Sequence, residues 1–574
     1  MSSAPPSPTT SRPRRLRFAA ALRLNRPSEI WFKPALSVVV SIAPPNLTLL
    51  VLDRLDLAMY TMAGSLCALY AHHRPYAARA RVLAGVVLGM LAGLAVALVT
   101  ACLTTNAAVL VTVGALLAAA QKALCDATRL GPPGNVVLTF VSSAALFAPQ
   151  SLGQVPGHLA LGLAAGAWAW LVCMAPGSLR PHGPERRATA QALTAAAAYA
   201  ATRGTGPGHA RARTAATAAV LAARQALLSG GARSASARPA LAHLLLRAEI
   251  ALAAPADADP ERLRARARAL RGTAPVPYDG EPTLPAPDTG ESPAERLRHR
   301  LVPLAPIAAR TALGCALAGY ASLALGIGRP YWALVTAAAL YQASLALTWS
   351  RGVQRVVGNL AGVLVFAAVA PLAHLGPAAL VLCCLAFSFG AEALISRNYW
   401  LGSVCVTPMA LLITEFTGYQ DPGDLVTERI VDTLVGALVG LVAAAAVTNR
   451  RAGTRLGQAL AAAERARERA ARLLAEPHPA PGALEAARRT LAAALVELRA
   501  TADAASGEWW QRTPPEDRVE RAEQAGHRTL AETVRRRGLV PDGRADGPAA
   551  NDPTSDGPVA HRATADDSTE DLRP

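Results

Sequence analysis

Charged residues, and lysine in particular, are scarce in this chain. Asp, Glu, Lys and Arg make up 17% of it, against about 25% in soluble proteins, whereas hydrophobic residues make up 52%. Lysine occurs only as Lys33 and Lys122, and neither follows the glycine that a Walker A phosphate loop needs before its lysine. The chain therefore has no nucleotide-binding loop of the kind that drives ATP-powered pumps.

Residue patterns that bind metals or carry catalysis are also missing. None of the eight cysteines stands in a C-x-x-C pair, and the eleven histidines form no H-E-x-x-H motif. The glycine cluster at 204–208 lacks a preceding strand and the G-x-G-x-x-G spacing. The net charge is +17, but aromatic residues amount to only 5%, without the basic and aromatic pattern of a nucleic-acid surface. We expect no enzyme, no metal, no cofactor and no nucleic-acid partner.

The hydrophobic residues are concentrated in two blocks, 30–176 and 302–448. A membrane-spanning helix needs about 20 mostly apolar residues, with a range near 17 to 25. Pro44 and Pro45 are expected to interrupt the first span, because proline removes a backbone donor. The sequence predicts an all-α, multi-pass membrane protein with two six-helix halves. Its twelve spans are placed at 34–52, 57–71, 82–103, 107–125, 135–149, 157–175, 308–326, 331–348, 356–373, 377–395, 399–414 and 429–448.

Basic residues are divided unevenly between the two sides of the membrane in this arrangement. With the N-terminus inside, the leader and inner loops hold fifteen Lys and Arg, whereas the outer loops hold only Arg54, Arg329 and Arg429. Cytoplasmic loops carry the excess of Lys and Arg in membrane proteins. Both ends of the chain are therefore predicted to lie in the cytoplasm.

The spacing of the basic residues also indicates an internal repeat. Four of them in the first block have a counterpart in the second, at offsets between 268 and 277 residues. An even number of spans in each half makes the repeat a parallel one, and a pathway between two such halves is typical of transporters. The pairs are Lys33 with Arg310, Arg54 with Arg329, Arg81 with Arg355, and Arg129 with Arg397.

The segments between and after the membrane blocks are predicted to form cytosolic helices. Residues 185–200, 211–229, 239–254, 260–271, 451–475 and 482–505 are rich in Ala and carry Arg at polar positions, which is typical of amphipathic helices. The predicted organisation is a basic cytosolic leader (1–29), a first membrane half (30–176), a cytosolic helical domain with a Pro-rich connector (177–301), a second membrane half (302–448), a cytosolic helical domain (449–540) and a disordered tail (541–574).

Ionisable residues at membrane depth are the first candidates for a functional site, because they are costly there. Glu392 lies five residues before Arg397, and Asp432 lies one helical turn after Glu428 at the start of the last span. These residues either stabilise helix ends as interfacial pairs or form a proton or anion relay. For Glu392, Arg397 and Arg355 are equally good partners.

Several segments of the second half resemble one known family. They are GRPYWALVTAAALYQ at 328–342, RGVQRVVG at 351–358, RNYWLG at 397–402 and VTPM at 406–409. Together they resemble the fusaric acid resistance protein family, which includes aromatic carboxylic acid exporters. The match covers about 310–448, and it departs from the family at Gly358-Asn359, where such proteins often read Gly-Thr.

The resemblance implies a bacterial cell-membrane protein that exports small anionic aromatic compounds by secondary transport. Tyr331 and Trp332 are expected at the outer membrane interface, where amphipathic aromatic rings are common. Arg351 and Arg355 either attract an anionic acid or only obey the orientation rule. The transport candidates are Glu392, Arg397, Arg355, Arg351, Asp432, Tyr331, Trp332 and Gln342.

A second hypothesis from a different class is a non-transporting membrane scaffold whose cytosolic helices bind a partner. Under the first hypothesis the partners are the lipid bilayer and a small aromatic acid. Assembly into a homo-oligomer is left open by the sequence.

Overall fold

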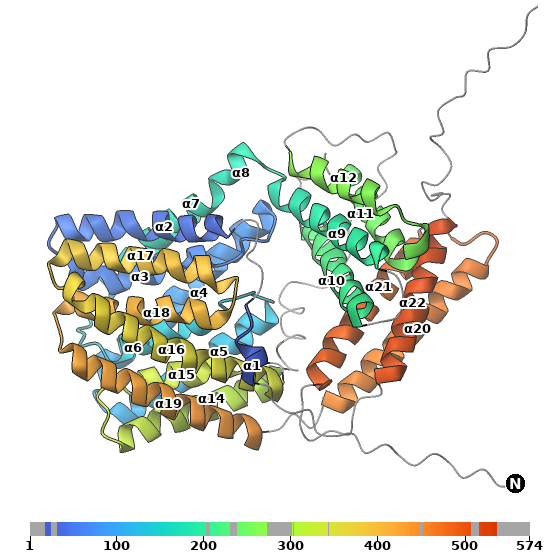
Figure 1. Cartoon of the computed structure of the whole chain (residues 1–574). Helices are drawn as coiled ribbons and strands as arrows, with labels where there is room; N and C mark the ends of the chain where they lie inside the picture. Colours follow the sequence, from blue (N-terminus) through green and yellow to red (C-terminus); the bar gives the residue numbers. More distant parts are fainter. Residues whose placement is uncertain are drawn as a thin grey trace, which may run out of the picture.

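The computed structural model describes residues 18–24, 31–202, 207–229, 238–272, 301, 304–342, 344–447, 452–480, 482–506 and 516–536. Every regular element in these residues is a helix, as predicted. The helices form two parts, a body of long apolar helices and, beside one end of it, a group of charged helices (Figure 1). We call the end of the body that faces the charged helices the proximal end, and the opposite one the distal end.

Nine helices of the apolar body, among the described residues, are long and apolar enough to cross a membrane. Their length follows from the apolar runs, since each residue of a helix adds about 1.5 Å along its axis. They are α2 (Phe32–Val51), α4 (Tyr76–Leu103), α5 (Ala107–Ala127), α7 (Val155–Met174, continued by α8, Pro176–Leu179), α14 (Ala305–Ala324), α16 (Leu345–Ala373), α17 (Pro377–Ile395), α18 (Tyr399–Thr414, continued by η6, Glu415–Thr417) and α19 (Pro422–Ala446).

Three of the twelve predicted spans coincide with shorter apolar helices. The first of these runs from Leu55 to Leu69, as η1 (Leu55–Leu57), α3 (Ala58–Ser65) and η2 (Leu66–Leu69). The other two are α6 (Val136–Leu146) and α15 (Tyr331–Leu340). All ten residues of α15 are buried. The count of twelve spans thus stays a prediction, with nine helices of sufficient length in the described part of the chain.

Several predicted boundaries in the body were wrong. The span 331–348 divides into α15 and the start of α16, so Arg351 and Arg355 lie inside a helix instead of a loop. Similarly, α19 begins at Pro422, and Arg429 lies two turns inside it. The prolines of the first span leave α2 continuous from Phe32 to Val51.

We use the name first half for α2 to α7 and second half for α14 to α19, and the two sets pack their helices in the same order. In the first half α3 packs on α7 and α4 packs on α6, and in the second half α15 packs on α19 and α16 packs on α18. The contacts between the halves are also reciprocal, because α5 packs on α14 and α17 packs on α2. The internal repeat itself stays a prediction.

Two glycines bring α16 and α18 close together. A Cβ atom added to Gly358 would stand 2.5 Å from the Ser403 Cβ atom, and one added to Gly362 would stand 2.7 Å from the Thr407 Cβ atom. Small residues four apart allow helices in a bilayer to approach backbone to backbone. The pair Gly358 and Gly362 therefore fixes α16 against α18.

The charged helices form two units, each with an apolar core of its own. The first unit consists of α9 (Gly183–Ala201), α10 (Pro207–Ser229), α11 (Arg238–Ala253) and α12 (Pro260–Arg271), around residues such as Leu193 and Leu245. The second consists of α20 (Ala452–Ala475), α21 (Ala483–Ser506) and α22 (Glu516–Arg535), around residues such as Leu491 and Leu498. The prediction placed the first six of these helices and missed α22. The Pro-rich connector and the tail lie outside the described residues.

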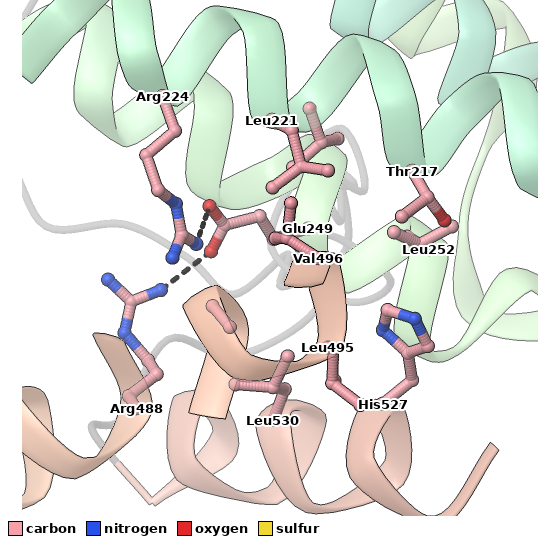
Figure 2. Close-up of a pocket in the computed structure, with 12 residues that line it drawn as sticks. Thr217, Leu221, Arg224, Glu249, Leu252, Arg488, Leu495, Val496, His527 and Leu530 are labelled. Carbon is pink, nitrogen blue, oxygen red and sulfur yellow. Dashed lines mark hydrogen bonds and ion pairs between the residues drawn. The ribbon is translucent and has the colours of Figure 1, made fainter. Parts of the chain in front are cut away.

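The two units meet at an ion-pair network beside a small cavity (Figure 2). Glu249 of α11 accepts hydrogen bonds from Arg224 of α10 and, at 2.6 Å, from Arg488 of α21. Burial opposes ionisation of Glu249, but the two guanidinium groups lower the pKa of its carboxyl below the ordinary value. The carboxylate is therefore charged at neutral pH and joins the two units.

Candidate functional site

Buried polar side chains follow one another along the second half, from its proximal to its distal end. They come from α14, α15, α16, α18 and α19, and several of them are almost fully buried in a segment that is otherwise apolar. Burying such groups away from water is costly unless they are paired or functional. We call this set the polar column and describe it from the proximal end.

Arginine and tyrosine side chains form the proximal end of the polar column. Arg355 of α16 is 3% exposed and donates a hydrogen bond through Nη1 to the Tyr399 hydroxyl of α18, at 3.1 Å. The guanidinium carbon of Arg351 lies 3.9 Å from the centroid of the Tyr399 ring, a cation–π contact. The Nε atom of Arg355 has no hydrogen-bond partner among the described residues. This end of the column therefore holds two positive charges and an unused donor.

Asn359 connects three helices in the middle of the column. Its Nδ2 atom donates to Thr433 Oγ1 of α19 at 3.0 Å, and its Oδ1 atom accepts from Thr407 Oγ1 of α18 at 2.7 Å. Asn359 is 1% exposed. It follows Gly358 in the sequence, and Thr407 belongs to the VTPM segment. Asn359 thus supplies one side-chain amide that forms hydrogen bonds with both hydroxyls.

Arg429 of α19 is a buried cation that stacks on an aromatic ring. It is 1% exposed, and its guanidinium carbon lies 4.0 Å from the centroid of the Trp332 ring of α15. Its Nε and Nη1 atoms have no hydrogen-bond partner among the described residues. Since a buried guanidinium is expensive without a counter-charge, this group is suited to receive an anion.

Asp432, one turn further along α19, forms no ion pair with that guanidinium among the described residues. Asp432 is one turn beyond Arg429 and fully buried, yet its Oδ1 atom accepts a hydrogen bond from Ser322 of α14, at 2.6 Å. Its Oδ2 atom has no partner among the described residues. Within this part of the chain, no ion pair joins Asp432 to Arg429.

Aromatic rings of the first half pack against Trp332, the ring that stacks on Arg429, and against Tyr331. Phe140 of α6 stacks on Trp332 with ring centroids 5.5 Å apart, and Phe147 lies 5.7 Å from Tyr331. Tyr331 and Trp332 are 6% and 1% exposed, so protein covers them instead of lipid. Their position at the outer membrane interface stays a prediction. They lie where the two halves of the body meet.

Two sets of polar contacts form the distal end. Arg329 forms an ion pair with Glu428 and a hydrogen bond with Gln420. His374 lies 3.0 Å, Nε2 to Oε1, from the buried carboxylate of Glu415. These contacts link the ends of α16, α18 and α19 and the start of α15.

The remaining predicted candidates lie apart from the column. Glu392 of α17 is half-buried and makes no ion pair or hydrogen bond through its side chain with other described residues. Arg397 is exposed just after the end of α17, and Gln342 is half-buried just after α15. Neither Arg397 nor Arg355 is paired with Glu392 in this part of the chain, contrary to both partners that the sequence suggested.

The structure adds Arg429 and Asn359 to the set. Asp421 accepts a hydrogen bond from the Asp424 amide as the N-cap of α19, and Pro422 follows it. An N-cap acid followed by proline is an established signal for a helix start. That signal places Arg429 inside a helix, although it says nothing of the Trp332 ring, 97 residues earlier.

No group of three or more metal-binding side chains occurs in the described ranges.

The part of the chain that carries the column matches a known family. Residues 316–443 match the family described as fusaric acid resistance protein-like, which confirms the resemblance for this segment. The uncharacterized membrane protein YvaC of Bacillus subtilis (strain 168) is 33% identical over 117 residues. These residues are 20% of this chain and 18% of the relative, so less than a fifth of the relative's length is matched. No solved structure matches significantly.

Proposed function

We propose that this chain is a secondary membrane transporter that exports small anionic aromatic compounds through the second half. The observation that carries the proposal is Arg429, a buried guanidinium stacked on Trp332 whose Nε and Nη1 atoms have no partner among the described residues. A carboxylate bound to its free Nε and Nη1 donors would gain charge-assisted hydrogen bonds. An aromatic ring attached to that carboxylate would meet the rings of Trp332, Tyr331 and Phe140. The chemistry of the site thus fits an aromatic acid.

The arrangement of the body supports the same proposal. Membrane transporters of several kinds bind substrate at the interface between two repeats, and Trp332 packs there against α6 of the first half. We keep the twelve-span, parallel-repeat architecture as part of the proposal, with the proximal end and both termini on the cytoplasmic side. The reciprocal pairs α5 with α14 and α2 with α17 are what two such repeats would form.

Uptake into proteoliposomes tests the proposal. The purified full chain is reconstituted, and a panel of aromatic acids is offered with and without a proton gradient. Arg429→Gln keeps hydrogen-bond donors but removes the charge, so it is expected to weaken binding of the acid about tenfold or more, since a hydrogen bond to a charged group contributes about 1.5–3 kcal/mol. Arg429→Lys keeps the charge and is expected to retain part of the binding. Trp332→Phe should be milder than Trp332→Leu.

The scaffold hypothesis gives a different result in the same experiment. A scaffold would move none of the acids, and Arg429→Gln would change neither binding nor flux. Equal affinity of the wild type and Arg429→Gln for every acid that is transported would remove Arg429 from the site.

A further inference from the structure

The N-terminal segment is bound to the proximal end of the polar column. Its helix α1 (Phe18–Ala21) packs against α16, and Figure 1 places it between the body and the helical units. The Ala21 carbonyl accepts hydrogen bonds from Gln354 Nε2, at 2.8 Å, and from Asn398 Nδ2, at 3.0 Å. Asn398 Nδ2 also donates to the Arg23 carbonyl at 2.8 Å, and Trp400 Nε1 donates to the Leu22 carbonyl at 3.2 Å.

These donors recognise the backbone of the segment instead of its side chains. The last carbonyls of a helix have no partner within the helix, and here three side chains of the body supply partners for the end of α1. Ala21 is 6% exposed and Asn398 is 7% exposed, so the central contact is shielded from water. The segment therefore occupies a built site.

The three donors flank the arginine and tyrosine groups of the column. Gln354 precedes Arg355 on α16, and Asn398 and Trp400 stand on either side of Tyr399 at the start of α18. A ligand that left the column at its proximal end would pass the residues that hold the segment. The contact therefore lies where a gate would act.

We propose that residues 18–24 form a plug that closes the proximal end of the polar column and must be released for transport. The proposal rests on the proposed function for its role, but the contact itself can be tested without any transport. Water-soluble reagents should be excluded from the column while the plug is bound. Releasing the plug should open the column and raise the flux.

Two substitutions keep nearly the shape of the side chain and remove only the hydrogen-bond donors that hold the plug. Asn398→Asp loses the amide that binds Ala21 and Arg23 but keeps an oxygen to accept from the Trp400 amide as the helix cap. Trp400→Phe removes the indole N–H that binds Leu22. Trp168→Phe is the matched control, because it removes a similar bond to the Val40 carbonyl, 3.0 Å long, in the first half.

Two introduced cysteines report, by their reaction with a thiol reagent, whether the plug is bound in the full chain. Leu22→Cys reports on the segment itself. Ser403→Cys lies in α18, one turn beyond Tyr399, at a position that is 2% exposed. Each reporter is compared with a chain that lacks it, to subtract labelling of the eight native cysteines. A small charged thiol reagent is applied from the side of the helical units, and flux of an aromatic acid is measured on the same preparations.

Labelling of both reporters is expected to rise at least threefold in Asn398→Asp and in Trp400→Phe, with at least a twofold rise in flux and no change in Trp168→Phe. Faster labelling at Leu22→Cys alone, with Ser403→Cys and flux unchanged, would make the segment an anchor and overturn the plug. Unchanged labelling of both would overturn the contact. If the wild type transports no acid of the panel, the proposed function fails, whereas Ser403→Cys still decides whether the segment closes the column.

Discussion

At the scale of single residues, the placement of Arg429 and Asp432 is unusual. They stand one turn apart on α19, both are buried, and each keeps atoms without a partner among the described residues. An ion pair would have satisfied both groups at once. The observed separation leaves the guanidinium available to a bound anion and the carboxylate available to a proton.

Removing the charge of Asp432 should therefore strengthen the binding of an anionic substrate. In Asp432→Asn the side chain can still accept the hydrogen bond from Ser322, but it no longer repels a nearby carboxylate. About 1 kcal/mol of repulsion corresponds to an affinity about fivefold higher, measured as the Kd of an aromatic acid on purified protein. Ser322→Ala is the control, since it keeps the charge. Weaker binding by Asp432→Asn would show that the carboxylate holds the substrate in place.

Glu392 remains a candidate for coupling transport to a proton gradient. An anchor at a helix end needs a partner, and Glu392 has none among the described residues. We therefore expect Glu392→Gln to leave the Tm of the purified protein unchanged or higher, because it removes an uncompensated charge at membrane depth. We also expect it to abolish gradient-driven transport. A normal coupled rate in this variant would end the relay hypothesis.

The sequence could indicate which residue types mattered, but not how they meet. Asp432 was found because a carboxylate stands out in an apolar segment, and Trp332 because it lies in a segment that resembles a known family. Their neighbours could not be inferred, because Trp332 meets Arg429 and Asp432 meets Ser322 across 97 and 110 residues. Such contacts depend on how the helices pack.

At the scale of the elements, the contact of α16 with α18 positions the column. Asn359 and Arg355 reach α18 from α16, and these hydrogen bonds require the close approach that Gly358 and Gly362 allow. A larger residue at Gly358 or Gly362 would separate both groups from their partners.

Gly358→Ala should therefore destabilise the protein. The new Cβ atom would stand 2.5 Å from Ser403 Cβ and 2.6 Å from the Trp400 carbonyl oxygen, and the backbone atom cannot give way easily. Overpacking of this kind costs typically 1–3 kcal/mol, to be measured as a lower Tm or a lower midpoint of denaturation. Gly85→Ala is the control, because a Cβ atom there would meet nothing within 4 Å. Equal stability of the two variants would contradict the proposed packing role.

Most elements could be predicted from periodicity and apolar length, whereas their ends could not. The start of α16 was missed because the apolar run from Tyr331 onward continues across the break between Leu340 and Leu345. Helix α22 was missed because its few buried apolar groups, such as Val519, lie among many charged residues. Where α16 begins and whether α22 forms depend on the helices against which they pack, and those helices lie far away in the chain.

At the scale of the whole molecule, the two helical units meet through groups that respond to pH. His527 of α22 lines the cavity beside Glu249 and Arg488 (Figure 2). Burial, with a smaller contribution from Arg213, lowers the pKa of His527 to about 4 from an ordinary value of 6.5. The imidazole is therefore neutral while the units are in contact.

Acidification should weaken the contact between the units. Separated units would take up a proton on His527 below about pH 6.5, whereas the joined units resist it down to about pH 4. The stabilisation is thus complete above pH 6.5 and is lost as the pH falls towards 4. Spin labels on Ala215→Cys and Thr490→Cys, in α10 and α21, should move apart over this range, and less so in His527→Gln. A distance that is independent of pH would contradict the expectation.

Labelling from outside the cell tests the orientation of the molecule. With the helical units in the cytoplasm, a cysteine placed near Gln150 or Gly418 at the distal end should react with an impermeant reagent. A cysteine near residue 230, after α10, should react only after the membrane is opened. Reaction at the last site in intact cells would exclude the proposed topology.

The buried helix α15 constrains the order in which the protein can be assembled. Ten helical residues extend about 15 Å, half the thickness of the hydrocarbon core, and exposed helix ends are not tolerated in lipid. This element is therefore not expected to partition into the bilayer by itself when it leaves the ribosome. It packs against α19, which is synthesised about 80 residues later. We therefore expect the segment that carries Trp332 to be inserted only after α19 has been made, so the proposed substrate site forms after most of the apolar body.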